Sequence, residues 1–187
     1  MLNAQPTSTS PARSLAGFQG HGYDKGRPRV IQAAWFAVQN LIFWKWWLPA
    51  NLRPKLLRAF GAQVGNNVFI RHRVRVLWPW KLTVGDNTWI GEDAWVLNLE
   101  PVTIGRDVCI SQGVFLCAGS HDQTSPTFEY DNGPIEIGDE VWVGAQAMIL
   151  RGVTVGRGAV VAARCKVSGN VPAGALVTDR GLRERSR

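Results

Sequence analysis

Aliphatic side chains recur at every sixth position from Val64 onward. A period of six fits neither the 3.6 residues of an α-helical turn nor the alternation of a simple β-strand. The repeat forms five groups of three positions: Val64, Ile70, Val76; Val84, Ile90, Val96; Ile104, Ile110, Leu116; Ile137, Val143, Ile149; and Val155, Val161, Val167. Because three such segments with one shared inward position close a three-sided turn, the pattern predicts an all-β parallel β-helix of about five coils over residues 62–178.

The outward positions of the repeat are large and apolar as well. Phe69, Trp89, Cys109 and Trp142 share one slot of the repeat, and Trp95, Phe115 and Met148 share another. Side chains at the same slot stack from coil to coil, so these positions predict flat apolar faces. A face of this kind is unfavourable in water unless another subunit covers it, and we therefore expect a homotrimer.

One interruption breaks the repeat between Leu116 and Ile137, where residues 121–136 form a loop. Long insertions in a regular solenoid tend to be functional, which makes this loop the expected site. His121 stands at its mouth, within the segment CAGSHD, whereas His21 and His72 have no comparable setting. A neutral imidazole there could take a proton from an attacking hydroxyl group.

Residues 29–61 do not follow the repeat and predict a helical appendage. Val30–Leu48 is expected to form one helix ended by Pro49, and Pro54–Phe60 a second helix ended by Gly61. The longer helix is apolar nearly all round and contains four tryptophans, but Gln32, Gln39, Asn40 and Lys45 argue against a membrane-spanning role. Two interpretations remain: packing against the β-helix or a neighbouring subunit, and contact with a membrane surface aided by the basic residues Arg27, Arg29, Arg53, Lys55 and Arg58.

The two ends of the chain predict little structure. Residues 1–28, which begin with a segment rich in Ser, Thr, Pro, Ala and Gln, are expected to be a disordered lead, and residues 179–187 a solvated basic tail. The N-terminus has no secretory signal pattern, and three cysteines without CxxC spacing suggest reduced thiols. We therefore expect a cytoplasmic protein, with the inner face of the plasma membrane as an alternative.

Charge and histidine count narrow the classes of function. The 21 Lys and Arg exceed the 14 Asp and Glu, giving a formal charge of +7 that favours phosphates, acidic polymers or an anionic membrane. No nucleic-acid-binding motif accompanies the charge, so no nucleic acid partner is expected. A zinc enzyme such as a γ-type carbonic anhydrase needs three converging imidazoles, which three scattered histidines do not readily supply, and no metal is expected. A non-catalytic scaffold at the membrane surface stays open.

Several segments resemble one known family. The repeat, the loop and the segments TIGRDVCISQGVFLCAGSHDQTSPTFE, PWKLTVGDNTWIGEDAWVLNLEPVTIG, VWVGAQAMI and YDKG are similar to the hexapeptide acyltransferases, in particular the acetyltransferases of colanic-acid and exopolysaccharide synthesis. The resemblance implies a left-handed β-helix, a trimer with active sites between subunits, acetyl-CoA as co-substrate, and transfer to a sugar hydroxyl of a glycan or exopolysaccharide precursor. A small non-glycan acceptor such as an antibiotic is the alternative.

The resemblance also assigns roles by position. His121 matches the general base, and Asn98 and Trp142 match residues beside the acceptor and the reacting centre; Asp122, next to His121, is also expected to bind the substrate. The N–H of Ala145 would bind the thioester carbonyl, and Ala163 and Ser168 would line the path of the cofactor. Lys166, Arg164 or the basic tail could supply charge for the cofactor's 3′-phosphate. Asn98 and Trp142 could instead be ladder residues. The chain departs from the family at Ser168-Gly169, where Thr-Lys is common, and at TDRG, where Gly-Asn-Pro-Ala usually closes the last coil.

Overall fold

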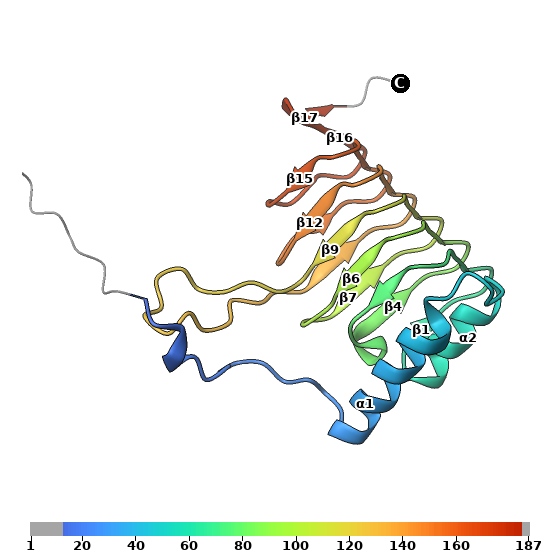
Figure 1. Ribbon diagram of the computed structural model, residues 1–187. Coiled ribbons are helices and arrows are strands. Elements are labelled where there is room, and N and C mark those ends of the chain that lie inside the picture. The colour runs from blue at the N-terminus through green and yellow to red at the C-terminus, as the bar shows by residue number, and fades with distance from the viewer. Residues whose placement is uncertain (1–12, 185–187) are drawn as a thin grey trace, which may run out of the picture.

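The computed structural model describes residues 13–184 and has the shape of a three-sided β-solenoid (Figure 1). Strands of successive coils pair in parallel and in register, so each side of the solenoid is one sheet. Five complete coils are followed by a partial sixth that begins at the Val155–Val171 bridge. The predicted parallel β-helix is therefore confirmed.

We name the three sheets side A, side B and side C. Side A contains β1 (Gln63–Val64), β4 (Leu82–Val84), β7 (Val102–Ile104), β10 (Ile135–Ile137) and β13 (Thr154–Val155). Side B contains β2 (Phe69–Ile70), β5 (Trp89–Ile90), β8 (Cys109–Ile110), β11 (Trp142–Val143), β14 (Val160–Val161), β16 (Ala175–Thr178) and β17 (Gly181–Glu184). Side C contains β3 (Arg75–Val76), β6 (Trp95–Leu97), β9 (Phe115–Cys117), β12 (Met148–Leu150) and β15 (Lys166–Val167).

The interior is a stack of the aliphatic positions of the repeat. On side B, Ile70, Ile90, Ile110 and Val143 pair from coil to coil and are at most 1% exposed. Burying one such side chain contributes roughly 1.5–3 kcal/mol, so the interior stack is the main source of stability. The six-residue pattern thus identifies the core positions directly.

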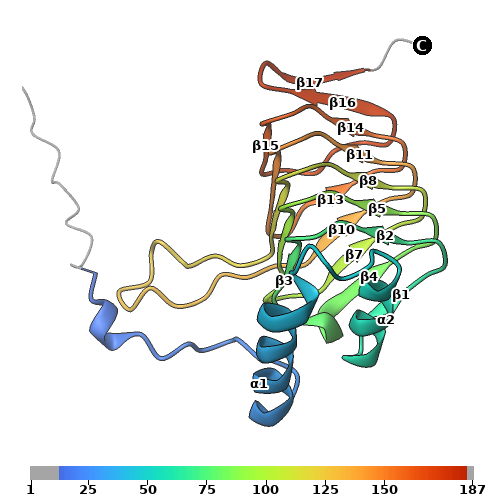
Figure 2. The same cartoon turned by 45° about the vertical axis from the view of Figure 1, so that its right-hand side comes forward.

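The helical appendage covers the open end of the first coil with α1 (Arg29–Val38), a π-helical turn η2 (Gln39–Phe43) and α2 (Leu52–Ala59) (Figure 2). Trp35, Phe43 and Leu57 are buried in the core cluster. The single helix predicted for Val30–Leu48 is wrong in its second half, because helical structure ends at Phe43.

A buried arginine explains why the helix ends there. The Arg53 guanidinium donates hydrogen bonds to the carbonyl oxygens of Phe43 (3.1 Å) and Lys45 (2.7 Å), at the point where the helical hydrogen bonding stops. Arg53 is 2% exposed, so it is not one of the surface cations expected from the sequence. Burial lowers the pKa of its guanidinium. In the described part of the chain, no helix is long and apolar enough to cross a membrane.

The two ends of the described chain are more ordered than their composition predicts. Residues 13–28 begin with a short 3₁₀ turn, η1 (Leu15–Gly17), and lie along the inserted loop, which differs from the disordered lead predicted for residues 1–28. Residues 1–12 lie outside the described residues. At the other end, β17 folds back antiparallel on β16, so part of the predicted tail at residues 179–187 is a strand that ends side B.

Candidate active site

The inserted loop is an antiparallel ribbon that projects from the solenoid between β9 and β10 (Figure 1). The Asp122 N–H donates to the Glu129 carbonyl (2.8 Å), His121 pairs with Tyr130, and the Asp131 N–H donates to the Ser120 carbonyl (3.0 Å). We call residues 118–133 the arm. These cross-strand bonds give the loop its own backbone pairing, which a long irregular loop would lack.

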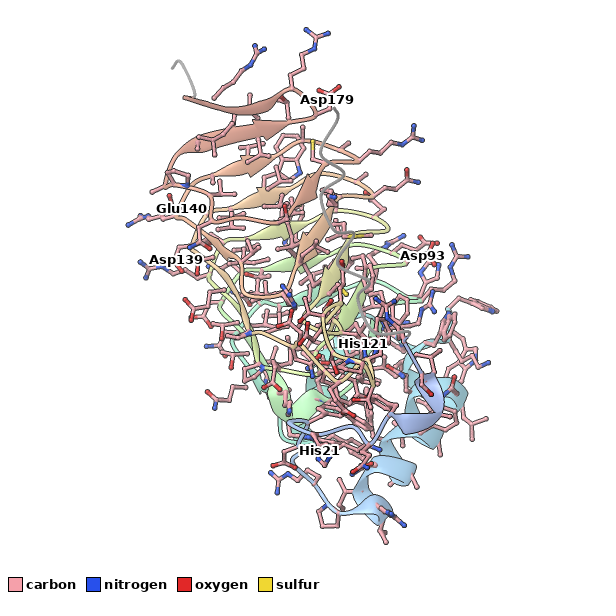
Figure 3. All side chains as sticks on the ribbon, turned by 90° about the vertical axis from the view of Figure 1, so that its left-hand side faces the viewer. His21, Asp93, His121, Asp139, Glu140 and Asp179 are labelled. Carbon is pink, nitrogen blue, oxygen red and sulfur yellow. The ribbon has the colours of Figure 1, made fainter. Side chains whose placement is uncertain are left out.

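His121 occupies the middle of the arm and is half-buried (Figure 3). Its Nδ1 lies 2.7 Å from the carbonyl oxygen of Phe128. Since a carbonyl oxygen can only accept, Nδ1 carries the proton, and the lone pair of the neutral ring is on Nε2. The ring stacks on Phe128 (centroids 4.4 Å apart) and Tyr130 (5.1 Å). The arrangement is that of a fixed imidazole with a free basic nitrogen.

The N-terminal segment lies against the arm, and we call residues 13–24 the strap. The backbone N–H groups of Gln19 (3.0 Å) and His21 (2.9 Å) donate to the two carboxylate oxygens of Glu129. The hydrogen bond from the Gln19 N–H, with a smaller contribution from that of His21, holds the pKa of Glu129 below its usual value. Phe18 contacts the His121 ring edge-on at 5.6 Å. The strap therefore forms one wall around His121.

Asp122 follows His121 in the chain, and its carboxylate forms hydrogen bonds within the arm. It accepts hydrogen bonds from the backbone N–H (2.8 Å) and hydroxyl (2.7 Å) of Thr124, which lower its pKa. Such a turn is a common use of aspartate at the start of a loop. Asp122 thus shapes the arm, a role that differs from the acceptor contact implied by the resemblance.

The Asn98 side chain is buried and bonded to the backbone of a neighbouring coil. The side chain is 0% exposed at the end of β6. Its Oδ1 accepts from the Trp78 N–H (2.9 Å), and its Nδ2 donates to the Trp78 carbonyl (2.6 Å). These two bonds use one hydrogen of Nδ2 and one lone pair of Oδ1 and join neighbouring coils. The structure therefore gives Asn98 a bridging role between coils, and the acceptor contact implied by the resemblance stays a prediction.

The remaining residues implied by the resemblance lie on sides B and C. Trp142 points outward from β11, is 54% exposed and donates its indole N–H to the Ser111 hydroxyl (3.0 Å). Ala145 and Ala163 occupy equivalent positions at the corner between sides B and C, one coil apart. The coils touch closely here, because a Cβ on Gly144 would lie 2.6 Å from the Ala163 nitrogen.

The last two positions lie farther around the fifth coil. Lys166 points outward from β15, and Ser168 follows at the opposite corner of side C. Both side chains are exposed, and with Ala163 they cross the face of side C. Their donors and their positive charge suit a ligand that carries phosphates.

Within one chain these residues do not form one site. The turn with Ala145 precedes β12, whereas the arm with His121 follows β9, its neighbour in the same sheet. Parallel strands place these two points at opposite edges of side C, separated by a strand of three residues, or about 10 Å. Within one chain, His121 and the Trp142–Ala145 corner therefore lie on opposite edges of this sheet.

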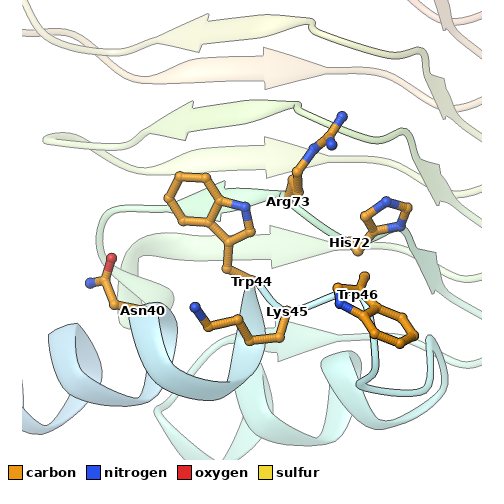
Figure 4. Close-up of a pocket in the computed structure, with 6 residues that line it drawn as sticks. All are labelled: Asn40, Trp44, Lys45, Trp46, His72 and Arg73. Carbon is orange, nitrogen blue, oxygen red and sulfur yellow. The ribbon is translucent and has the colours of Figure 1, made fainter.

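Other chemically active groups lie away from the arm. His21 is on the strap, with Nε2 2.9 Å from Gln19 Oε1, and Asp93, Asp139, Glu140 and Asp179 lie along the edges of the solenoid (Figure 3). His72 contacts Glu92 at 3.1 Å beside a pocket of about 490 Å³ between η2 and the turn after β2 (Figure 4). Among residues 13–184, no three or more His, Cys, Asp or Glu side chains are placed to hold a metal ion.

Comparison with known proteins assigns the family. Two family models match, "Bacterial transferase hexapeptide (six repeats)" at residues 134–169 and "Hexapeptide repeat of succinyl-transferase" at residues 81–118. The protein of Escherichia coli strain K12 named as a colanic acid biosynthesis acetyltransferase, WcaF, is 42% identical over 86% of this chain and 89% of its own length. The chain belongs to the hexapeptide-repeat acetyltransferases. It is therefore an acetyl-CoA-dependent acyltransferase.

Other acetyltransferases are similar to this chain at lower sequence identity. The galactoside O-acetyltransferase of Escherichia coli strain K12 is 28% identical over 64% of this chain and 61% of that protein. Among solved structures, the hexapeptide-repeat acetyltransferase VCA0836 of Vibrio cholerae, in complex with acetyl coenzyme A, has a TM-score of 0.77 and 25% identity and covers 91% of this chain and 96% of its own.

Sequence reasoning missed most residues that surround His121. Phe18 and Glu129 had no local signal, because their partners lie about a hundred residues away along the chain, and the same holds for the contact of Tyr130 with Phe18. Phe128 could have been suspected from its place in a long loop, but nothing in the sequence indicated that its carbonyl would face the imidazole. In this acetyltransferase the strap and the arm together make the wall of the site.

Proposed function

We propose that this acetyltransferase moves the acetyl group of acetyl-CoA to a hydroxyl group of a sugar in a glycan or exopolysaccharide precursor, with His121 as general base. The observation that carries the proposal is the bond from His121 Nδ1 to the Phe128 carbonyl, which leaves Nε2 free to accept a proton. Support for a sugar acceptor comes from the names of the relatives, which include a colanic acid and a galactoside acetyltransferase.

The proposed reaction balances with these groups alone. Nε2 takes the proton of the acceptor hydroxyl as the oxygen attacks the thioester carbonyl, and the negative charge that develops on that carbonyl oxygen is stabilised by the N–H of Ala145. The carbon–oxygen bond forms and the carbon–sulfur bond breaks. The protonated ring then returns its proton to the leaving sulfur, so free CoA thiol and the acetyl ester are released.

The proposed site is shared between subunits of a homotrimer. His121 of one copy would meet Trp142 and Ala145 of the next, because one chain keeps them at opposite edges of side C. The exposed ladder of Phe69 (42%), Trp89 (61%) and Trp142 (54%) on side B supplies an apolar surface for the contact. Lys166 and Ser168 would take the phosphate end of the co-substrate.

The test is release of CoA thiol from acetyl-CoA in the presence of a panel of acceptors: free sugars, nucleotide sugars, glycan intermediates, amino sugars and aminoglycoside antibiotics. We expect acceptor-dependent release with a hydroxyl-bearing glycan intermediate, and mass spectrometry of the product should show an ester that hydroxylamine removes. Release only with amines, giving a product that resists hydroxylamine, would contradict the proposal of O-acetylation.

A further inference from the structure

The outward face of α1 and η2 is apolar, although the inner face of this segment already packs Trp35 and Phe43 in the core. Val30 is 77% exposed, Phe36 68% and Leu41 67%. On the inner side, Gln39 is half-buried and accepts a hydrogen bond from the Val76 N–H (2.8 Å). A surface helix of a globular protein normally has polar side chains opposite its apolar stripe, whereas this segment is largely apolar on both sides. The apolar outer face therefore calls for something that covers it.

The apolar surface continues into the turn after η2, where Trp46 is 80% and Trp47 53% exposed. Figure 4 shows Trp46 on this turn, on the other side of the chain from Trp44, which points toward the strands. We call the outward side chains of this segment the apolar face: Val30, Phe36, Leu41, Ile42, Trp46 and Trp47. An exposed apolar surface of this extent marks an interaction site.

The charged side chains around the apolar face are all cationic. Between Asp24 and Asp86 the sequence contains 11 Lys and Arg and no Asp or Glu. Arg27, Arg29, Lys45 and Lys55 are exposed, and no ion pair holds any of them within residues 13–184. The partner that fits this surface is therefore apolar and negatively charged.

We propose that the apolar face docks on an anionic lipid bilayer. Tryptophan side chains favour the boundary between headgroups and acyl chains, and lysine and arginine at the rim of the face attract anionic headgroups. A second copy of the chain is a poorer occupant, because it would bring the same excess of cations to the contact. Trp35 and Phe43 hold the opposite side of the segment in the core, so the segment lies along the bilayer surface.

Docking of this face would bring the proposed active site to the membrane. The strap leads from the arm to the start of α1, and both views show the arm leaving the side of the solenoid while α1 lies at the end of the first coil, with the strap running between them (Figures 1 and 2). The docking itself does not depend on the proposed function. Vesicle binding requires no acetyl-CoA, and acetyl transfer to a soluble acceptor requires no lipid, so the two proposals fail separately.

The test is sedimentation of the full-length protein with vesicles of phosphatidylglycerol and phosphatidylcholine, against vesicles of phosphatidylcholine alone. We expect binding to the anionic vesicles that weakens as salt is raised. The double variant Leu41→Glu, Trp46→Glu should reduce the apparent affinity at least about tenfold, since both side chains would carry charge into the interface. Leu182→Glu is the matched control, because Leu182 is exposed on β17 at the far end of the solenoid.

A second pair of variants tests the charge. Lys45→Gln with Lys55→Gln should weaken binding to anionic vesicles, whereas Arg183→Gln on β17 should leave it unchanged. Retained thermal melting of each variant would show that it is folded. Failure of the wild-type protein to bind anionic vesicles, or equal binding by the double variant, would overturn the proposal. A change in the oligomeric mass of the double variant without lipid binding by the wild type would assign the face to a second copy instead.

Discussion

The Nδ1 atom of His121 lies 2.7 Å from the carbonyl oxygen of Phe128, directly across the arm. This contact fixes the tautomer of the imidazole through the backbone of the arm, without a carboxylate partner. The position of the basic Nε2 atom therefore depends on the conformation of the arm. Hydrogen bonds of Asp122 within the arm and of the strap along its side maintain that conformation. The base is therefore positioned by segments from two distant parts of the chain.

The Glu129 carboxylate is expected to hold the strap in place. Glu129→Ala removes the acceptor for the Gln19 and His21 N–H groups, so these amides should exchange with solvent faster, and kcat should fall more than the affinity for acetyl-CoA. Hydrogen exchange followed by mass spectrometry measures the first effect. Glu136→Ala, on the outer face of β10, is the control and should change neither. Unchanged exchange at residues 19 and 21 would show that the strap is held by other contacts.

The same contact predicts a pH dependence. Because the N–H groups of Gln19 and His21 lower the pKa of Glu129 in the folded protein, the stabilisation is present above the ordinary carboxyl pKa of 4.5 and is lost as the pH falls through the lower folded value. Protection of the strap amides should therefore stay constant near neutral pH and disappear only in acid. Loss of protection between pH 8 and 6, far above any carboxyl pKa of this kind, would be inconsistent with this account.

Asn98 is expected to matter for stability. Asn98→Ala leaves the Trp78 N–H without its partner and removes one of the two hydrogen bonds to the Trp78 carbonyl, which should cost about 1–3 kcal/mol of unfolding free energy. Thermal or denaturant unfolding measures the loss, with the exposed Asn66→Ala as control. A variant with unchanged melting temperature but a raised KM for the acceptor would restore the contact implied by the family resemblance.

Close stacking of the coils should make Gly144 intolerant of a side chain. A Cβ there would meet the Ala163 nitrogen at 2.6 Å, whereas one on Gly169 would meet no atom within 4 Å. Gly144→Ala should lower the unfolding free energy by about 1–3 kcal/mol through displaced backbone, and Gly169→Ala should be nearly neutral. Equal melting temperatures for the two variants would mean that the coils can separate at this corner without cost.

The fold could be predicted in detail because its core is encoded by position alone. Ile110 and Val143 stand at the sixth position of the repeat, and in the structure they pair in adjacent coils with their side chains in the interior. Val30–Leu48 shows the limit of such reasoning: apolar composition extended the predicted helix, but carbonyl groups bound by Arg53 end it at Phe43. The interaction joins α2 to η2, so it produces no hydrophobic or polar pattern in the sequence of either element.

The candidate site was predictable only at its centre. His121 was identified because it stands where the repeat breaks, whereas Glu129 and Phe18 act through contacts between segments about a hundred residues apart. Residues 13–28 contain too few apolar side chains for their composition to predict an ordered segment. In the structure, the backbone N–H groups of Gln19 and His21 attach this segment to the Glu129 carboxylate. The bridge that Asn98 forms between coils was not predictable in the same way, because its partner is the backbone of Trp78 in the neighbouring coil.

A shared site predicts complementation between inactive subunits. Ala163→Trp should block the exposed corner between sides B and C, and His121→Ala should remove the base, so each variant alone should be inactive. When the two are co-expressed, random pairing would place an intact His121 against an intact corner at about a quarter of the interfaces of a trimer. Activity near that fraction is expected in the purified mixture. A mixture as inactive as its parents would place the whole site within one chain.

The most direct test of the central claim is the rate of acetyl-CoA-dependent acetyl transfer by His121→Ala, measured as thiol release with the best acceptor of the panel. General base catalysis by Nε2 predicts a fall in kcat of about 10²- to 10⁴-fold, with assembly and CoA binding retained. His72→Gln, which changes a histidine paired with Glu92 away from the arm, should keep the wild-type rate. Near wild-type turnover by the His121 variant would contradict the account.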